Sequence, residues 1–336
     1  MYATLQEALQ FKGDGADHII DECLKVCPEV TGIDKYNGGR SIPMDYGTED
    51  SDTMETMFMT SVPESNPYRD ANTGVLPIKG TYEKRLTQLA TATAFWQVDS
   101  AIIEKNPQAG ARLMLQRAIA SVTSHIQAHG RQFYYGQKNG GYPEGFPGLC
   151  DLMSKEQVVD AGGTGAKLTS AYFIWFNEDG VSWRYGMNGQ MAMGEPRECT
   201  LTDPTNPAKK FPGIEQYMQY YPGLKVSNKY SIGRIANIDV TSAYTSAFDP
   251  KAFTDGHMYQ LLTRLPAGMR PNVIFMPYVA ALLLAASRAT VQFSKDASGN
   301  QVMVGGLTPA VSEFEGILIV PTDSIKVGEK KVTFAA

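Results

Sequence analysis

Cysteine, long apolar runs and secretion signals are scarce in this 336-residue sequence, and each scarcity excludes a class of protein. Four cysteines are too few for a disulfide framework. Cys23 and Cys27 lie four residues apart and have no partners at metal-ligand spacing, so we interpret them as small apolar side chains in a reducing cytoplasm. The longest apolar stretch, YVAALLLAAS, is far shorter than the roughly 20 residues that span a bilayer. The opening MYATLQEALQFKGDGADH also lacks the basic start and apolar core of a signal peptide. We therefore expect no membrane partner.

Apolar residues, in contrast, are plentiful enough for a large core. Hydrophobic residues make up 43% of the chain and aromatic residues 10%, which excludes a disordered protein. A folded chain of this length buries about 75% of its extended surface. The net charge of -5 means that the molecule as a whole is no general binder of polyanions, and only local basic patches are left for that role.

A glycine-rich stretch at residues 158–176, VVDAGGTGAKLTSAYFIWF, lacks the spacing of a phosphate-binding loop. Ala166 separates Gly165 from the lysine, Leu168 stands where a hydroxyl is needed, and Asp160 occupies the place of the first glycine. The loop also leads into a strand-like segment, whereas phosphate loops lead into a helix. The glycines therefore predict a turn between two strands.

Other catalytic motifs are missing as well. His125 and His129 stand four apart, but HIQAH lacks the glutamate of a zinc protease. The sequence contains no G-x-S-x-G elbow and no cysteine beside a histidine. We predict no catalytic residue, no cofactor and no metal ligand, and hence a protein that is not an enzyme. The alternative is a soluble α+β enzyme whose site is assembled from scattered carboxylates.

Carboxylates are absent from one long segment, residues 105–143. The basic residues of this segment are Lys105, Arg112, Arg117, Arg131 and Lys138. A helix in a free monomer usually carries some Glu at i, i+4 spacing. Three interpretations stay open: a solvated basic face, counter-charges on another subunit, or an enclosed nucleic acid. The acidic run formed by Glu49, Asp50, Asp52 and Glu55 is a candidate partner.

The periodicity predicts a mixed α+β chain without repeats. Residues 1–35 have the pattern of an amphipathic helical segment. Residues 33–80 are poorly patterned, and we interpret them as an extended arm and hairpin that pack on something else. A helix is expected to begin at Pro107, with an apolar stripe at Leu115, Ile119, Val122 and Ile126 and with Gly130 as a stop or a weak point near its end. Later segments predict a hairpin around EDG, a long strand at 223–240, and a helix, strand, helix and strand between 255 and 325.

The order of these segments resembles the major capsid proteins of tailed bacteriophages, most of all those of short-tailed phages. The resemblance rests on a long helix ending in RQFYYG, the turn PEGFPGL, and the later stretches YYPGLKVSNKYSIGRIANIDV, LLTRLPAGMRPNVIFMPYVAALLLAASRA and EFEGILIVPTDSI. It covers roughly residues 81–325 and implies the Hong Kong 97-type capsid fold. The implied parts are an N-terminal arm at 1–52, an extended loop at 53–90, a peripheral domain at 91–149 with its spine helix at 107–133, axial parts at 150–215 and 245–336, and a long peripheral strand at 216–244. Residues 225–240 are expected to pair with 95–103.

The resemblance also implies a function and partners. Hexamers and pentamers of the chain would form an icosahedral shell around double-stranded phage DNA, touching that DNA only weakly. The implied partners are a separate scaffolding protein, a portal protein and a decoration or cement protein, with assembly in the host bacterial cytoplasm. An encapsulin-like nanocompartment is the alternative within the same fold. Candidates for contact between subunits are Glu49, Asp50, Asp52, Glu55, Arg69, Lys79, Arg112, Arg117 and Arg131.

Overall fold

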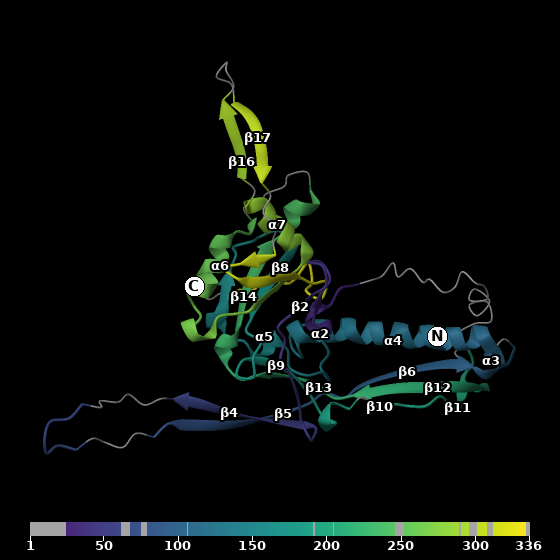
Figure 1. Cartoon of the computed structure of the whole chain (residues 1–336). Coiled ribbons are helices and arrows are strands. Elements are labelled where there is room, and N and C mark those ends of the chain that lie inside the picture. The colour runs from purple at the N-terminus through teal and green to yellow at the C-terminus, as the bar shows by residue number, and fades with distance from the viewer. Residues whose placement is uncertain are drawn as a thin grey trace.

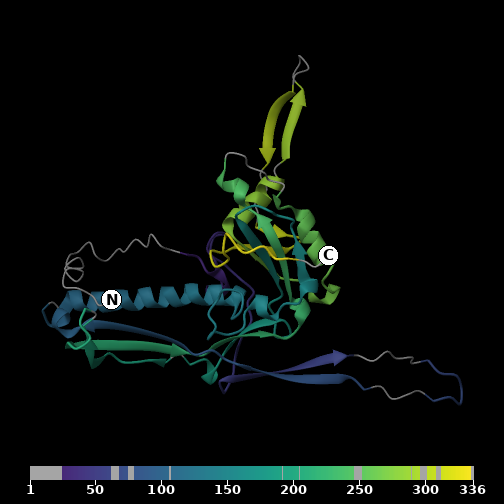
Figure 2. The ribbon, with the colours of Figure 1, turned by 180° about the vertical axis from the view of Figure 1, so that it is seen from behind.

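The structure is a computed structural model of the whole chain. It describes residues 25–61, 68–74, 79–105, 107–190, 192–203, 205–245, 252–288, 290–295, 301–307 and 312–333. Two packed bodies carry two projecting hairpins (Figure 1), and the view from behind shows both hairpins pointing away from the bodies (Figure 2). The expected α+β content is confirmed. The predicted helical segment at 1–35 falls mostly outside the described residues, and α2 (Pro28–Thr31) is its described helix.

The first body is built on a six-stranded sheet that is buried on both faces. Its order is β18-β19-β15-β8-β14-β7. The strands are β7 (Val158–Asp160), β8 (Leu168–Ile174), β14 (Ile232–Asp239), β15 (Val273–Met276), β18 (Glu313–Phe314) and β19 (Ile317–Pro321). Side chains alternate between faces along a strand, so Phe173 and Ile274 pack in one core while Tyr172 and Phe275 pack in the other. The apolar runs of β8 and β15 follow from this double burial.

Helices cover one face of this sheet, and the end of a long helix covers the other. α6 (Asp255–Leu262) and α7 (Tyr278–Arg288) add Leu261 and Leu284 to the first core. Phe133 and Tyr134, from the last turn of α4 (Pro107–Tyr135), enter the second core together with Trp183. The predicted helices and the buried strand between them are therefore confirmed.

The second body consists of α4 and a four-stranded sheet. The remaining elements of this body are β6 (Ala92–Asp99), α3 (Ser100–Lys105), β10 (Ala192–Met193), β11 (Arg197–Thr202) and β12 (Lys210–Tyr220). β12 pairs with β6 on one side and with β10 and β11 on the other. Trp96 and Met218 of the sheet pack against Met114, Ala118 and Val122 of the helix.

The packing face of α4 differs from the predicted stripe. Leu115 and Ile119 are 62% and 55% exposed, because the helix turns Leu113, Met114 and Ala118 toward the sheet instead. Gly130 is not the stop that was one of its two predicted roles. The helix continues to Tyr135 and gives way to Gly136, whose φ of +58° suits the residue that follows a helix.

The predicted pairing of residues 225–240 with 95–103 is wrong. β6 pairs antiparallel with β12, from Ala92 opposite Tyr220 to Asp99 opposite Gly213. The 223–240 segment is interrupted at Asn228, whose side chain accepts a hydrogen bond from the Tyr230 amide at 2.9 Å. It divides there into β13 (Pro222–Val226) and β14, and β14 lies between β7 and β8 in the other body.

A small sheet joins the two bodies. β3 (Tyr46–Thr48), β9 (Val181–Tyr185) and β13 form it, beside the short pair β1 (Ile33–Asp34) and β2 (Arg40–Ser41) and the helix α5 (Leu149–Leu152). The expected hairpin around EDG is present only as a tight turn, in which the Val181 amide donates to the Trp175 carbonyl at 2.9 Å. The predicted pairing of the flanking strands is wrong, since β8 and β9 belong to different sheets. The glycine loop is a turn between β7 and β8 as predicted, held by the Gly165 amide donating to Asp239 Oδ2 at 2.8 Å.

The described short 3-10 turns are η2 (Lys155–Gln157), η3 (Met187–Gly189), η4 (Lys229–Ser231), η5 (Thr241–Tyr244) and η7 (Ala267–Met269).

The two hairpins project from this framework. β4 (Thr53–Ser61) pairs with β5 (Thr81–Gln88), and β16 (Thr290–Lys295) pairs with β17 (Gln301–Leu307). The hairpin expected within residues 33–80 is thus present, and its second strand lies just beyond that range. Figure 1 shows β4 and β5 extending to the left below the body with the six-stranded sheet, in the direction opposite to α4 and the β6–β12 sheet.

Candidate subunit interface

The β4–β5 hairpin is firmly attached at its root. Met54 and Leu89 are buried there, and the Leu89 amide donates to the Asp52 carbonyl at 2.8 Å. A methyl group at Gly186 or Gly223 would collide with the Leu89 side chain, so these glycines provide its seat. No sequence pattern indicates this arrangement, because both glycines are remote from Leu89 in the chain.

Beyond the root, the hairpin presents apolar side chains to solvent. The register places Glu55 opposite Leu86, Met57 opposite Lys84 and Met59 opposite Tyr82, so these pairs share one face. The large apolar members of this face are 56–72% exposed: Met57, Met59, Tyr82 and Leu86. A lone two-stranded hairpin is marginally stable in water. This face, which we call the hairpin face, is therefore suited to pack on another surface.

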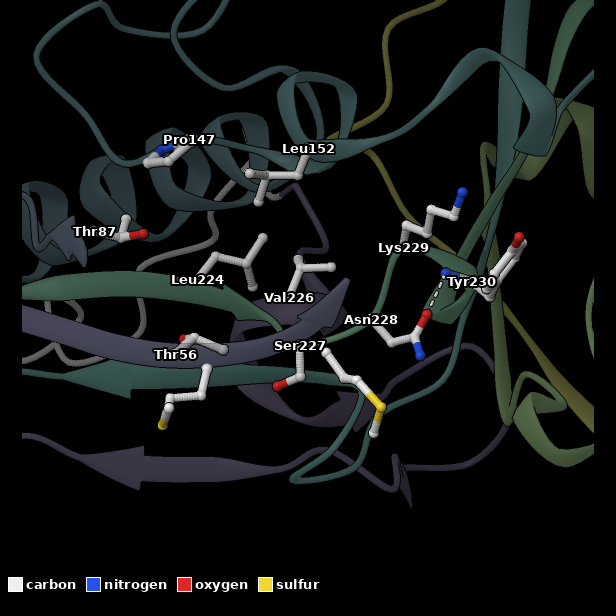
Figure 3. Close-up of a pocket in the computed structure, with 12 residues that line it drawn as sticks. Thr56, Thr87, Pro147, Leu152, Leu224, Val226, Ser227, Asn228, Lys229 and Tyr230 are labelled. Carbon is white, nitrogen blue, oxygen red and sulfur yellow. Dashed lines mark hydrogen bonds between the residues drawn. The ribbon is translucent and has the colours of Figure 1, made fainter. Parts of the chain in front are cut away.

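An open cleft of about 650 Å³ lies at the inner part of the hairpin. On the hairpin side it is lined by Thr56, Met57, Met59 and Thr87, and on the body side by Pro147, Leu152 and Leu224 (Figure 3). Its remaining wall runs along residues 226–230, where the Asn228 cap closes the turn. The cleft combines apolar floor residues with open access, which suits a side chain or loop of another molecule.

The acidic residues predicted as contacts are distributed around the hairpin root. Glu55 pairs with Lys84 across the hairpin at 2.6 Å, and Glu49 lies 4.0 Å from Arg184 in the small sheet. Asp50 and Asp52 are exposed. The structure thus places Glu49 and Glu55 in ion pairs of their own chain, and contact of any of the four with another subunit stays a prediction.

The basic candidates lie at three separate places. Arg69 is near the outer end of the hairpin, where its guanidinium donates to the Thr73 carbonyl at 3.0 Å, and Lys79 is exposed just before β5. Arg112 and Arg117 are partly buried on α4, and Arg131 lies in its last turns. The nine candidates therefore form no single site, and their roles between subunits remain predictions.

Arg131 contributes to a small basic pocket that the sequence did not reveal. This pocket measures about 240 Å³, and its three cationic side chains are those of Lys25, Arg131 and Lys326. Arg131 Nε and Lys326 Nζ each donate to the Gly140 carbonyl at 3.2 Å. Partial burial and the nearby Arg131 lower the pKa of Lys326. The pocket's carboxylate, Asp323, accepts a hydrogen bond from the Val26 amide at 2.9 Å.

A buried ionic network fixes the C-terminal segment. Arg234 donates to Glu329 at 2.9 Å, and the same carboxylate accepts from Ser170 and Tyr135 at 2.5 Å each. Burial, followed by the neighbouring Glu329, raises the pKa of Tyr135 and keeps its phenol protonated. The network joins α4, β8, β14 and the residues after β19, and each of its members is too far from the others in sequence to be linked by a motif.

The histidine pair of α4 is structural. His129 is buried, and burial lowers its pKa to about 4. Its Nδ1 lies 3.2 Å from both the His125 carbonyl and the Tyr220 hydroxyl. Within the part of the chain that the structure describes, no three His, Cys, Asp or Glu side chains gather as metal ligands. Among the described helices, none has both the length and the hydropathy to cross a membrane.

Two layered bodies, a long helix and a projecting hairpin with an apolar face define a shell-forming protein with the Hong Kong 97-type capsid fold. The chain belongs to the family described as major capsid protein GP7, whose model matches residues 44–333. It is a structural protein of the phage capsid. No curated protein matches the sequence.

The structure of bacteriophage Epsilon15 agrees with this fold: a chain in it is 20% identical, with a TM-score of 0.68 over 99% of this chain and 98% of that one. The bacteriophage JBD30 capsid is 12% identical, with a TM-score of 0.49 over 92% and 94% of the two chains. The SrpI encapsulin complex from Synechococcus elongatus PCC 7942 is also 12% identical, with a TM-score of 0.38 over 68% and 96%.

Proposed function

We propose that this protein assembles as hexamers and pentamers into an icosahedral shell that encloses the double-stranded DNA of a tailed phage. One observation carries the proposal: the hairpin face lies on an element that projects from its own subunit (Figure 1). Apolar side chains gain about 25 cal/mol for each Å² removed from water. A neighbouring subunit that covers this face supplies that burial, and repetition around a ring joins each subunit to the next.

We assign the parts of the subunit accordingly. The β4–β5 hairpin is the extended loop, the body of α4 with β6 and β12 is the peripheral domain, and the six-stranded sheet is the axial domain. β14 goes with the axial domain, because it pairs with β7 and β8. The chain before residue 53 acts as the N-terminal arm.

Further partners follow from the same role. We assign to the shell a scaffolding protein encoded separately, a portal protein at one vertex, and a decoration or cement protein on the surface, with assembly in the bacterial cytoplasm. The enclosed DNA contacts the shell weakly, since the chain carries a net charge of -5. We assign this contact to the basic pocket of Lys25, Arg131 and Lys326.

A shortened hairpin tests the central proposal. Residues 56–85 are replaced by Asn-Gly, a pair that closes two-residue hairpins. Glu55 then meets Leu86 as in the native register, and the buried Met54 and Leu89 are retained. We expect the wild type, supplied with its scaffolding protein, to form shells in negative-stain micrographs. The shortened chain should keep its circular dichroism and thermal midpoint but stay as small species in light scattering.

Two results would contradict the proposal. Shells of normal size from the shortened chain would show that the hairpin is dispensable for assembly. A wild type that stays monomeric or dimeric with scaffold present would show that the chain does not form the shell by this route.

A further inference from the structure

The carboxyl group of Glu29 is completely buried, and no described cation pairs with it. Glu29 lies in α2, within residues 25–34 at the start of the described chain, which we call the anchor segment. It packs against Gly130 of α4, where a methyl group would collide with Glu29 Oε1 and Ser324 Oγ. A buried carboxylate without a cation is costly, because nothing compensates the loss of its hydration.

Hydroxyl groups surround this carboxyl on the body side. Thr322 Oγ1 donates to Glu29 Oε2 at 2.8 Å. Glu29 Oε1, Ser324 Oγ and Tyr134 OH are buried nearby without a well-aligned hydrogen bond to any described residue. Ionised carboxylates only accept hydrogen bonds, whereas a protonated carboxyl also donates one. A proton on Oε1 would remove the buried charge and would let this carboxyl donate as well as accept among these hydroxyls.

The two buried titratable side chains beside Glu29, those of Cys27 and Tyr134, stay neutral near neutral pH. Burial, followed by the neighbouring Glu29, raises the pKa of the Cys27 thiol to about 11, and burial raises that of the Tyr134 phenol well above 10. Asp323 and Lys25 act on Cys27 from the rim, where Asp323 is hydrogen bonded to the Val26 amide. Burial raises the pKa of Glu29 itself to about 7, and the hydroxyls of Ser324, Thr322 and Tyr134 offset part of that rise.

Glu29 contributes to several of the contacts that hold the anchor segment. Trp183 Nε1 donates to the Glu29 carbonyl at 3.0 Å, and the Asp323 amide donates to the Val26 carbonyl at 3.0 Å. We propose that Glu29 is a proton-controlled latch, which fastens the anchor segment to α4 and to residues 322–324 when neutral and loosens it when ionised.

The direction of the pH effect follows from linkage. The ordinary pKa of a glutamate is near 4.5, below the value in the docked state. The docked state therefore binds more protons than the released state between these values. Docking is strongest below about pH 4.5, weakens as the pH rises to about 7, and changes no further above that. The difference amounts to a factor on the order of a hundred in the docking equilibrium.

Hydrogen exchange of the unassembled full-length chain tests the latch. Amide protection of peptides from the anchor segment is measured from pH 5 to pH 8, after correction for the intrinsic exchange rate. We expect wild-type protection to fall strongly over this range. Glu29→Gln imitates the neutral carboxyl and should keep high protection throughout, and Glu144→Gln, at an exposed carboxyl, should follow the wild type.

A second variant keeps the test decisive if the Glu29→Gln protein fails to fold. Thr322→Val removes the hydroxyl that donates to the carboxylate, so the midpoint of the loss should move to higher pH. Wild-type protection that is constant from pH 5 to pH 8, or an unchanged midpoint in Thr322→Val, would overturn the latch.

The importance of the latch for shells rests on the proposed function, since a loosened anchor segment is free to contact another subunit. The two ideas fail separately. Exchange in the unassembled chain decides the latch, whereas shell formation by the wild type, followed by microscopy in the same buffers, decides the proposed function.

Discussion

At the scale of single residues, close approaches between backbone and side chain decide which substitutions the fold tolerates. Gly130 lies inside α4, where glycine usually costs about 1 kcal/mol relative to alanine. It is retained in this fold because the anchor segment and Ser324 pack directly on it. The same reasoning explains why Gly130 could be mistaken for the end of the helix, since sequence cannot distinguish a stop from a packing contact.

Gly130→Ala should therefore destabilise the protein by about 1–3 kcal/mol, because the added methyl overpacks a buried contact. Gly256→Ala in α6 is the matched control: its methyl would meet Thr254 Oγ1 at an ordinary 3.4 Å. That control should be neutral or stabilising by up to about 1 kcal/mol. Urea unfolding of both variants measures the difference, and equal stability in the two would refute the packing argument.

Residues that carry the charge chemistry were the least predictable part of the chain. Glu29 stands in CPEVTG with no charged neighbour in sequence, and its partners lie about 100 to 300 residues away. The Arg234–Glu329 pair is equally remote. Composition and periodicity report only local preferences. A site that is assembled from residues far apart in the chain therefore cannot be recognised from them.

At the scale of elements, strong local signals were predicted well. The long helix, the buried strand β15 and the helix α7 each have a continuous pattern of their own, and each is present. The 223–240 segment failed because one capped turn at Asn228 divides two strands of similar composition. Which strands pair was beyond the sequence, since β6 and β12 are separated by more than 100 residues.

The hairpin face offers the sharpest prediction at this scale. Met59→Asp with Leu86→Asp places two charges where we expect a neighbouring subunit to bury apolar side chains. Monomer stability should change by less than about 1 kcal/mol, because both side chains are exposed in the monomer. Shell yield in light scattering should fall at least tenfold. Met193→Asp, at an exposed methionine of β10, is the control and should assemble normally. Normal assembly of the double variant would show that the face stays uncovered in the shell.

At the scale of the whole molecule, the chain is acidic overall but has a local basic pocket formed by Lys25, Arg131 and Lys326. The carboxylate-free segment at 105–143 indicated a local excess of positive charge around Arg131. The other two cations of the pocket, Lys25 and Lys326, come from opposite ends of the chain and were found only in the folded structure.

Binding of a fluorescent DNA duplex by the unassembled chain measures the role of this pocket. Each phosphate contact contributes a slope of about 0.9 to the dependence of log affinity on log salt. Arg131→Gln with Lys326→Gln should weaken binding and reduce the slope by about 2. Lys209→Gln with Lys210→Gln removes the same charge from an exposed strand end and should leave the slope nearly unchanged. Equal slopes in the two double variants would assign the binding to overall charge alone.

The seat of Leu89 between Gly186 and Gly223 has a mechanical consequence. The hairpin is attached to the body at its root, through the described contacts of Leu89. From there the nine residues of β4 extend about 30 Å at 3.3 Å per residue. Bending the ribbon by about 10° over that length displaces its far end by about 5 Å while the root keeps its packing. One subunit design can thereby tolerate unequal angles between neighbours, as a closed surface with both sixfold and fivefold corners demands.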